Sequence, residues 1–301
     1  MEWKRLGLIK APMELNPWHN NSMLQPTPIL MDDVIRVYAG FRDENGVSRV
    51  GAIDLDAENP TKVVGVCKKP LLDIGRDGMF DENGVCPTAI IRCGSDIRLY
   101  YAGYCQGKKV RFWGFTGLAI SQDGEHFERY QETPVTDRVK SEELFRAIHS
   151  IMFDGEKYRV WYGGGDKFIQ GEHKTLPVYD IRYMESEDGI HFPPQGTLAI
   201  PVPEGYHRAG RPYVFRENDI YKMYYGVGME KIPYQLAYAE SLDGVKWDVK
   251  DINLPLSKEG FDSQMMAYPA FIRNKNGKGF LFYNGNNYGW DGFGCAELIS
   301  E

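Results

Sequence analysis

The sequence lacks the cysteine patterns that build disulfide frameworks and zinc sites. It has five cysteines, an odd number, and no two of them form a Cys-x-x-Cys pair. Disulfide-stapled domains carry even sets of cysteines, and structural zinc sites carry closely spaced ligand pairs. We therefore expect reduced thiols in a cytoplasmic protein; the five are Cys67, Cys86, Cys93, Cys105 and Cys295.

The sequence also lacks a basic run and a long apolar run. Acidic residues outnumber basic ones by 42 to 35, which gives a formal net charge of -7. Nucleic-acid binding needs clustered lysine and arginine to neutralise phosphates, so nucleic acid is not an expected partner. Residues 1–12 carry four charged side chains and no apolar stretch of seven. We therefore expect neither a signal peptide nor a membrane span.

Familiar catalytic motifs are missing as well. There is no glycine-rich phosphate loop, no Gly-x-Ser-x-Gly turn and no His-Glu-x-x-His helix. The six histidines are not spaced as metal ligands. We expect no cofactor and no structural transition metal.

Glycine and tyrosine, in contrast, are abundant. The 33 glycines make up about 11% of the chain, where about 7% is usual, and there are 19 tyrosines. They fall into a motif of aromatic residues followed by small ones, which occurs five times. The final glycines of these motifs lie 63, 61, 62 and 59 residues apart, at Gly40, Gly103, Gly164, Gly226 and Gly285.

Two further markers follow the same period. One precedes most of the aromatic strands by about a dozen residues, at Pro28, Pro87, Ser150, Pro212 and Pro269. The other is a Ser-x-Asp-Gly turn in repeats two to four, at residues 121–124, 186–189 and 241–244. Asp-Gly is a hairpin signal, and the Ser and Asp side chains can bond the amides of the turn. We interpret these turns as structural; a direct ligand role for Asp123, Asp188 or Asp243 is the alternative.

Each repeat of about 60 residues has the content of one four-stranded propeller blade. The sequence therefore predicts a single all-β domain over residues 1–301, a five-bladed β-propeller with blades of about four antiparallel strands. The fifth repeat is one strand short, and residues 3–9 can supply it and close the ring without a free edge. A linear β-solenoid is the weaker alternative. Whether a calcium ion or water occupies the central channel is left open.

Polar side chains cluster just before the innermost strands, where loops of a propeller enter the central cleft. Carboxylates, arginines, amides and aromatic rings together suit a polyol, because sugars need hydrogen-bond partners and flat rings, and two carboxylates can share acid and base work. The residues are His19, Asn20, Asn21 and Gln25; Asp81, Glu82 and Asn83; Glu142, Glu143, Arg146 and His149; His207, Arg208 and Arg211; and Asp262, Ser263, Gln264 and Tyr268.

Each of these candidates has a structural alternative. Asp81 and Glu82 can cap the turn that follows them, and Glu142 and Glu143 can lie on a solvated surface. Arg42 and Asp43 can form an ion pair, His149 can be a core histidine, and Asp262 can be a turn residue. Arg208 and Arg211 are the better site candidates, because two cations at a strand entrance need anionic or polyol company.

The chain resembles, along nearly its whole length, glycosyl-hydrolase-like five-bladed propellers. These are relatives of glycoside hydrolase family 43, the invertases and the mannoside phosphorylases, in a subgroup associated with bacterial surface-polysaccharide genes. Each segment is weakly specific alone, but their order and spacing are fairly specific. The segments are residues 26–30, 36–43 with Ser48, 80–85, 117–124, 261–269, and 283–285 with 292–294.

The sequence departs from its better-known relatives in two places. The arabinanase group has a catalytic Asp just before a proline of the first blade, whereas the matching segment here, residues 23–26, has no carboxylate. The subgroup commonly has Glu where this chain has Gln264. Both departures remove an acid or base, so hydrolysis by the familiar pair is in doubt.

The resemblance implies a sugar-processing cleft on the propeller axis. We expect an enzyme of glycosidase type, a hydrolase or phosphorylase acting on a glycan or activated sugar, and inverting if hydrolytic. A non-catalytic glycan-binding propeller and a sugar transferase of polysaccharide biosynthesis are the alternatives. The candidate base is Asp81 or Glu82, and the candidate acid is Glu143 or Asp262. The expected ligand, a carbohydrate or sugar phosphate, is assigned to Arg42, Asp43, Asn83, His149, Arg208, Arg211, Gln264, Tyr268 and Asn284.

Overall fold

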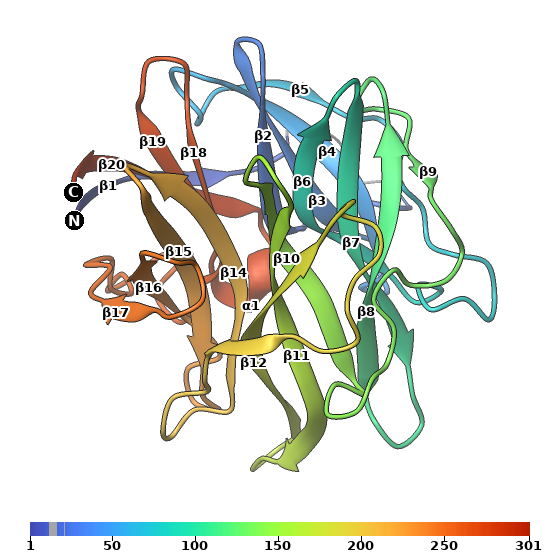
Figure 1. The fold of residues 1–301 in the computed structure, drawn as a ribbon. Helices are drawn as coiled ribbons and strands as arrows, with labels where there is room; N and C mark the ends of the chain where they lie inside the picture. Colours follow the sequence, from blue (N-terminus) through green and yellow to red (C-terminus); the bar gives the residue numbers. More distant parts are fainter. Residues whose placement is uncertain (12–16, 21) are drawn as a thin grey trace.

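The computed structural model describes residues 1–11, 17–20 and 22–301; Asn21, one of the candidate residues, lies outside them. Within these residues the regular structure is β-strand apart from one short helix, α1 (Asn286–Gly289), so the all-β prediction is confirmed. Antiparallel pairing joins the strands in five groups of four, which we call units 1 to 5 (Figure 1). Short parallel pairings, β8 with β10 and β12 with β14, link units 2, 3 and 4 into one 12-stranded sheet.

The units follow one another along the chain. Unit 1 is β2 (Met23–Met31), β3 (Val34–Arg42), β4 (Ser48–Asp56) and β5 (Val63–Val66). Unit 2 is β6 (Val85–Cys93), β7 (Asp96–Gln106), β8 (Phe112–Ser121) and β9 (Glu128–Arg129). Unit 3 is β10 (Phe145–Phe153), β11 (Tyr158–Gln170), β12 (Thr175–Ser186) and β13 (Thr197–Ile200). Unit 4 is β14 (Arg208–Glu217), β15 (Ile220–Gly228), β16 (Gln235–Ser241) and β17 (Asp248–Lys250). Unit 5 is β18 (Ala267–Arg273), β19 (Gly279–Asn284), β20 (Phe293–Ser300) and β1 (Glu2–Ile9).

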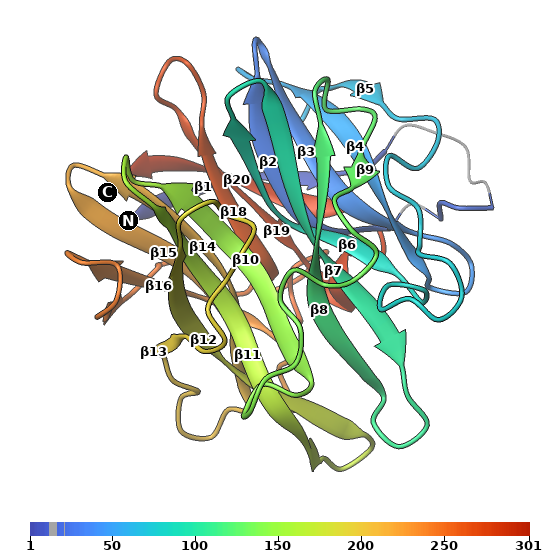
Figure 2. The same cartoon turned by 45° about the vertical axis from the view of Figure 1, so that its right-hand side comes forward.

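The two ends of the chain meet in unit 5. Strand β1 pairs with β20 in antiparallel register, from Glu2 opposite Ser300 to Ile9 opposite Phe293. The termini accordingly lie side by side in both views (Figures 1 and 2). This confirms the prediction that the N-terminal stretch supplies the strand that the fifth repeat lacks.

The units are arranged around their first strands. Strand β2 contacts β6, β6 contacts β10, β10 contacts β14, β14 contacts β18, and β18 contacts β2. The apolar core is divided in the same way, because five buried clusters each lie between two neighbouring units. One of them joins unit 5 to unit 1, with Phe280 and Phe282 packed against Ile35 and Val37.

The aromatic motifs form the second strand of every unit, and the Ser-x-Asp-Gly turns dock onto them. Tyr38 donates a hydrogen bond of 2.8 Å to the carbonyl of Gly124 in the next unit. Tyr100 and Trp161 make the equivalent bonds, of 2.6 and 2.8 Å, to Gly189 and Gly244. In each turn the Asp carboxylate accepts the amides two and three residues on, and the glycine takes a φ between +70° and +76°. The structural interpretation of these turns is confirmed.

Every first strand carries a β-bulge, which in four of the five strands lies near the start of the strand. The pairing register shifts between Leu24 and Thr27 in β2, and at the matching place in β6, β10, β14 and β18. The bulge of unit 1 contains Pro26, whereas the sequence marker Pro28 lies beyond it and pairs regularly with Val37. Bulges re-aim side chains, so this feature decides what faces the centre of the molecule.

No helix in the described part of the chain is long and apolar enough to cross a membrane.

Candidate functional site

A cavity of about 280 Å³ lies where the first strands converge. This volume is near the lower end of the range for small-molecule sites, which suits a small ligand or the end of a longer one. Four of the five bulged strands contribute the side chain at or beside the bulge: Gln25, His149, Arg211 and Tyr268. The lining also includes Tyr104, Arg111, Phe112, Phe145, Lys174, Tyr179, His207, Arg208, Glu230, Tyr234 and Tyr288.

The backbone is strained at the cavity. Gln25, Arg211 and Tyr268 have φ values of 56°, 54° and 56°, in the left-handed region that side chains other than glycine disfavour. Tyr288, also in the lining, has a φ of 56°. Strain of this kind costs roughly 1–3 kcal/mol per residue and clusters at functional sites. Three of these four residues occupy the equivalent bulge, so the fold repeats one strained conformation to turn side chains toward the centre.

The cavity is cationic although the protein is acidic. Its lining contains four basic side chains, Arg111, Lys174, Arg208 and Arg211, and a single carboxylate, Glu230. Glu230 is exposed, and it accepts the backbone amide of Glu172. Arg208 and Arg211 are only 8% and 2% exposed. The buried positive charge is therefore not matched by buried negative charge from the lining residues.

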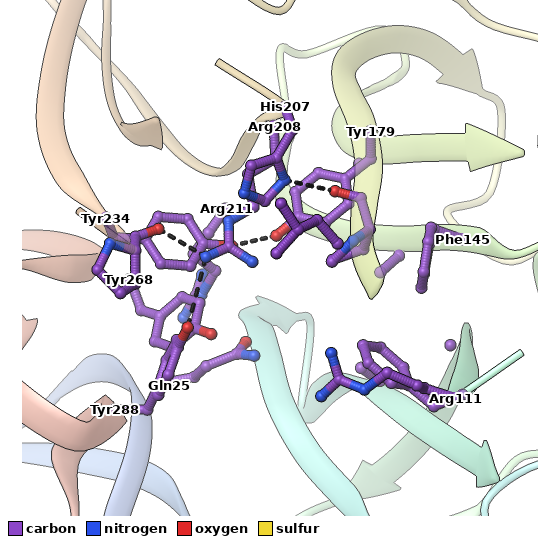
Figure 3. Close-up of a pocket in the computed structure, with 18 of the residues that line it drawn as sticks. Gln25, Arg111, Phe145, Tyr179, His207, Arg208, Arg211, Tyr234, Tyr268 and Tyr288 are labelled. Carbon is purple, nitrogen blue, oxygen red and sulfur yellow. Dashed lines mark hydrogen bonds between the residues drawn. The ribbon is translucent and has the colours of Figure 1, made fainter. Parts of the chain in front are cut away.

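Arg208 lies among tyrosines. Its guanidinium carbon is 4.1 Å from the centre of the Tyr234 ring, and its Nη2 donates to the Pro233 carbonyl at 2.6 Å and to the Tyr288 hydroxyl at 3.4 Å. Its Nε is buried with no hydrogen-bond partner among the described residues. Figure 3 shows Tyr234, Tyr268, Tyr288 and Gln25 gathered on one side of the cavity, with Phe145 and Arg111 opposite.

The opposite wall is apolar. The Phe112 and Phe145 rings are 5.6 Å apart, and Arg111 lies 5.7 Å from the Phe112 ring. Arg111 also donates to the Thr175 carbonyl at 3.0 Å, which links the β7–β8 and β11–β12 hairpins beside the cavity. One wall thus presents tyrosine hydroxyls and the Arg208 guanidinium, and the other presents phenylalanine rings and the Arg111 guanidinium.

Two histidines line the cavity in their neutral form. His207 is 4% exposed, and burial lowers its pKa. Its Nδ1 lies 2.8 Å from the Pro177 carbonyl and must be the donor, which leaves Nε2 as a buried acceptor without a partner in the described structure. Burial, with a contribution from the charge of Arg211, holds the pKa of His149 well below its usual value. His149 thus lines the site, unlike the core histidine that was its structural alternative.

Three buried carboxylates at the blade entrances lie outside this lining, each in what we call a brace. A brace is a buried carboxylate bonded to the tyrosine hydroxyl of the second strand and to an arginine of an outer strand. Its three examples are Asp81 with Tyr101 (3.2 Å) and Arg129 (2.9 Å); Glu142 with Tyr162 (2.8 Å) and Arg182 (2.8 Å), and with Arg146 at 2.9 Å; and Asp262 with Tyr283 (2.9 Å) and Arg5 (3.0 Å).

The brace residues are almost completely enclosed. Asp81, Glu142 and Asp262 are 1%, 0% and 2% exposed. Burial and the adjoining carboxylate raise the pKa of Tyr101, Tyr162 and Tyr283, so these hydroxyls remain protonated donors. The structure therefore gives Asp81 and Asp262, a candidate base and a candidate acid, a place inside a unit and away from the cavity lining.

The other two candidate carboxylates lie on turns. Glu82 accepts the Gly78 amide at 2.6 Å, so it caps its turn, and the exposed Glu143 accepts the Ser141 amide at 3.1 Å. Neither lines the cavity. Acid–base roles for Asp81, Glu82, Glu143 and Asp262 stay predictions. The exposed Glu143 and the turn residue Asp262 agree with their structural alternatives. The alternatives for the others were wrong: Asp81 is buried in an ion pair with Arg129, Glu82 caps the amide of Gly78 before it, and Glu142 is buried and not solvated.

The remaining predicted binding residues also divide. His149, Arg208, Arg211 and Tyr268 line the cavity, whereas Arg42, Asp43, Asn83, Gln264 and Asn284 do not. Asn284 supports a lining residue without lining the cavity itself, because its Oδ1 accepts a hydrogen bond of 2.7 Å from the Gln25 amide. Arg42 donates to the Tyr288 carbonyl at 2.7 Å.

Two of these residues have other partners, and a third is exposed. Asp43 pairs with Arg49 at 3.0 Å, not with Arg42. Asn83 accepts the Gln106 amide at 2.8 Å, and the side chain of Gln264 is exposed.

The sequence prediction missed much of the cavity wall. Tyr104, Arg111, Tyr179, Tyr234 and Tyr288 come from second and third strands and from the loops that join them, which the search before the innermost strands did not cover. Tyr179 and Tyr234 share a hydrogen bond between their hydroxyls across units 3 and 4. One sequence signal was available: Tyr104 is an aromatic residue near the end of a second strand, β7, at the end away from the Asp-Gly turn.

Among the described residues, no three His, Cys, Asp or Glu side chains gather as a metal-binding group.

Comparison with known proteins gives the family. No family model matches the chain. The uncharacterized protein Rv1502 of Mycobacterium tuberculosis is 32% identical over 302 residues, covering 99% of both chains. A 1,2-beta-oligomannan phosphorylase of Thermoanaerobacter is 34% identical over 68 residues, which is 20% of this chain and 22% of that protein.

Solved structures agree on the fold. A thermostable family-43 glycoside hydrolase has a TM-score of 0.69 at 18% identity, covering 96% of this chain and 94% of its own. An alpha-L-arabinofuranosidase from Lactobacillus brevis has a TM-score of 0.69 at 10% identity, covering 95% and 94%. The chain therefore belongs to the same family as Rv1502, and its fold is that of the glycoside hydrolase structures.

Proposed function

We propose that the five units form a closed five-bladed propeller whose central cavity binds a sugar next to a phosphate group. The phosphate is either part of a sugar phosphate or an inorganic phosphate beside the end of a glycan. This makes the chain a carbohydrate-active protein of the phosphorylase or sugar-phosphate type, in preference to a hydrolase that works with two carboxylates.

The observation that carries this proposal is the unmatched positive charge. A buried guanidinium without a carboxylate is costly unless a ligand supplies the negative charge. Arg208 has its Nε unpartnered, and no described residue accepts a hydrogen bond from its Nη1, so two nitrogens are free for an anion. Guanidinium groups bind phosphate with paired hydrogen bonds, which suits this arrangement.

The rest of the lining suits a sugar ring. Ring faces of tyrosine and phenylalanine offer flat apolar surfaces, and sugars stack on such surfaces while their hydroxyls seek donors and acceptors. Two buried acceptors are vacant: Oε1 of Gln25 and Nε2 of His207. Both can accept hydrogen bonds from sugar hydroxyls, so the cavity holds donors for an anion and acceptors for hydroxyls.

Hydrolysis by two carboxylates has weaker support. It requires an acid and a second carboxylate on either side of the glycosidic bond, roughly 5–9.5 Å apart. The cavity lining has only Glu230, and Gln25 occupies the segment where the arabinanase group places its base. In phosphorolysis the phosphate is itself the nucleophile, so one acid group is enough. The short match to an oligomannan phosphorylase supports the same direction.

A non-catalytic binding protein is the second candidate, because Glu230, the one carboxylate in the described lining, is exposed and accepts a hydrogen bond from the Glu172 amide. In that case the cavity binds the sugar phosphate without turnover.

Calorimetric titration tests the proposal with mannose, mannose 1-phosphate and inorganic phosphate. We expect saturable binding that requires the phosphate group and is lost in Arg208→Ala. The matched control is Arg216→Ala, on the same strand, where the arginine is exposed and paired with Asp219. Equal binding of mannose and mannose 1-phosphate, or unchanged binding in Arg208→Ala, contradicts the proposal.

Turnover separates the two candidates. The protein is incubated with β-1,2-linked mannobiose and phosphate, and products are followed by mass spectrometry. Mannose 1-phosphate that forms only with added phosphate identifies a phosphorylase, release of mannose without phosphate identifies a hydrolase, and binding without either product identifies a binding protein.

A further inference from the structure

Arg211 connects the first strands of four units. From β14 its Nη1 donates to the Thr88 carbonyl of β6 at 2.7 Å and to the His149 carbonyl of β10 at 3.4 Å. Its Nη2 donates to the Thr27 hydroxyl of β2 at 2.9 Å and to the Pro26 carbonyl at 3.3 Å. No other contact described above joins so many units through one side chain.

These contacts use most of the donors that Arg211 has. A guanidinium carries five N–H groups, and the four on the terminal nitrogens are directed to these four oxygen atoms. Only Nε, which is buried and unpartnered, is left. The terminal nitrogens of Arg211 therefore have no N–H group left to donate to an anion, whereas Arg208 has, although both arginines line the cavity.

The four acceptors are neutral, so the charge of Arg211 is solvated by dipoles and not by a counter-ion. Burial lowers the pKa of Arg211 to about 10, which still leaves the group protonated at neutral pH. The acceptors form a cage of three carbonyl oxygens and one hydroxyl, contributed by three strands that are distant in sequence. Such a cage is complementary to a planar cation.

The acceptors belong to the bulges that aim side chains into the cavity. Pro26 and Thr27 directly follow Gln25, and His149 offers its own carbonyl while its ring lines the cavity. Fixing these carbonyls fixes the backbone from which Gln25 and His149 project. The strained φ of Arg211 is part of the same arrangement, because it sends this side chain across the molecule.

We propose that the structure contains a guanidinium-binding cage, formed by Pro26, Thr27, Thr88 and His149 and occupied by Arg211, which positions the cavity wall. Arg211 is thus a positioning residue and not the anion-binding group. The proposal that it tunes ligand affinity rests on the proposed function, but the cage itself does not depend on any sugar.

Chemical rescue tests the cage. Arg211→Ala empties it, and we expect the unfolding midpoint to fall by roughly 5–10 °C, because several buried acceptors lose their donors. Millimolar guanidinium chloride, far below denaturing concentration, should raise the midpoint again in a saturable way, while sodium chloride and urea should not. Arg216→Ala, whose arginine is exposed, should show no response to guanidinium.

Hydrogen exchange gives a readout that involves no sugar. In Arg211→Ala we expect faster exchange in strands β2 and β10, and guanidinium should restore protection there. If Arg211→Ala does not fold, Arg211→Lys replaces it: a single ammonium has three donors for four acceptors, so β2 and β10 should still exchange faster than in the wild type.

The outcomes separate the two proposals. Unchanged exchange in β2 and β10, or an absent response to guanidinium, overturns the cage. A variant with wild-type stability and exchange but without affinity for mannose 1-phosphate overturns it as well, since Arg211 is then a direct anion ligand. Wild-type protein that binds no phosphate ligand, together with guanidinium rescue of Arg211→Ala, refutes the proposed function and leaves the cage intact.

Discussion

Tyrosine and arginine meet in two kinds of place in this molecule, the braces and the cavity. In the braces of units 2, 3 and 5, a tyrosine hydroxyl and an arginine share a buried carboxylate, as Tyr101 and Arg129 share Asp81. Around the cavity, Arg208 lies against Tyr234 with no carboxylate in contact. Both places contain tyrosine and arginine, but of the two only the braces contain a buried carboxylate in the described structure.

This difference separates arginines that are paired with a buried carboxylate from a buried arginine that is not. In each brace a carboxylate neutralises an arginine, although Oε2 of Glu142 and Nε of Arg146, an ion pair at 2.9 Å, make no hydrogen bond. The cavity is incomplete, and its arginine and histidine retain free nitrogens. Buried polar groups are normally satisfied, so a concentration of unsatisfied ones at one place is informative.

The largest expected effect comes from removing the charge of a brace. Glu142→Gln leaves Arg146 and Arg182 without their shared carboxylate, and breaking a buried pair costs about 3–5 kcal/mol of unfolding free energy. Urea denaturation measures this. The control is Glu143→Gln, one residue on and exposed, where a change within about 0.5 kcal/mol is expected. Equal losses in both variants would show that Glu142 is not a brace.

The cavity should respond in the opposite way. Arg208→Met removes a buried charge that has no carboxylate, so we expect the unfolding free energy of the ligand-free protein to stay the same or to rise by about 1 kcal/mol. Affinity for mannose 1-phosphate should fall by about 10–100-fold, as for a lost charged hydrogen bond. Denaturation and calorimetry of the same variant check both. A loss of stability as large as that of Glu142→Gln contradicts the comparison.

A smaller effect is expected from the tyrosines of the second strands. Tyr101→Phe removes one donor from buried Asp81 and should cost about 1–3 kcal/mol. Tyr225 has the corresponding position in unit 4 and is 2% exposed, but no described residue hydrogen-bonds its hydroxyl. Tyr225→Phe should therefore be close to neutral in the same denaturation experiment, and a matching loss there would mean that the carboxylate is irrelevant.

Acid should weaken the fold through its buried histidines. Burial lowers the pKa of His19 to about 4, and it lowers those of His149 and His207. Below about pH 6.5 the unfolded chain binds protons that the folded one rejects, so stability present above this pH is lost as pH falls, by up to roughly 1 kcal/mol per pH unit for each histidine.

The charged groups around the two cavity histidines add to this loss of stability at low pH. His149 faces Arg211, and His207 faces Arg208, Lys174 and Glu230, so cations outnumber carboxylates around both rings. Denaturation at pH 7 and pH 5 measures the slope, and His149→Gln and His207→Gln should each reduce it. An unchanged slope in both variants excludes these two histidines as its source.

The sequence predicts this fold better than its site for a physical reason. Strand periodicity, Asp-Gly turns and the missing fifth-unit strand are local patterns, and each appeared where it was expected. Whether a carboxylate serves a site or a brace depends on distant partners. Asp262 forms an ion pair with Arg5, which lies 257 residues earlier in the chain, and no spacing pattern predicts this pair.

The strained backbone at the cavity could likewise not be predicted from the sequence. Nothing in the residues around Gln25 indicates a left-handed φ, and Tyr288 lies in a loop that has no repeat marker. His149, Arg208, Arg211 and Tyr268 were found because they lie just before the periodic markers Ser150, Pro212 and Pro269, and three of them, all but Arg208, lie at the bulges.

Because β1 pairs with β20, unit 5 can be completed only after both of these strands have been synthesised. On the ribosome, Trp3 emerges early, but its ring partners Tyr224 and Phe271 and the strand it joins are synthesised last. The first strand must therefore wait unpaired, a state that slows folding and invites aggregation. Moving residues 2–9 to follow residue 300 by circular permutation should remove the wait and give a chain that completes its last unit as it leaves the ribosome.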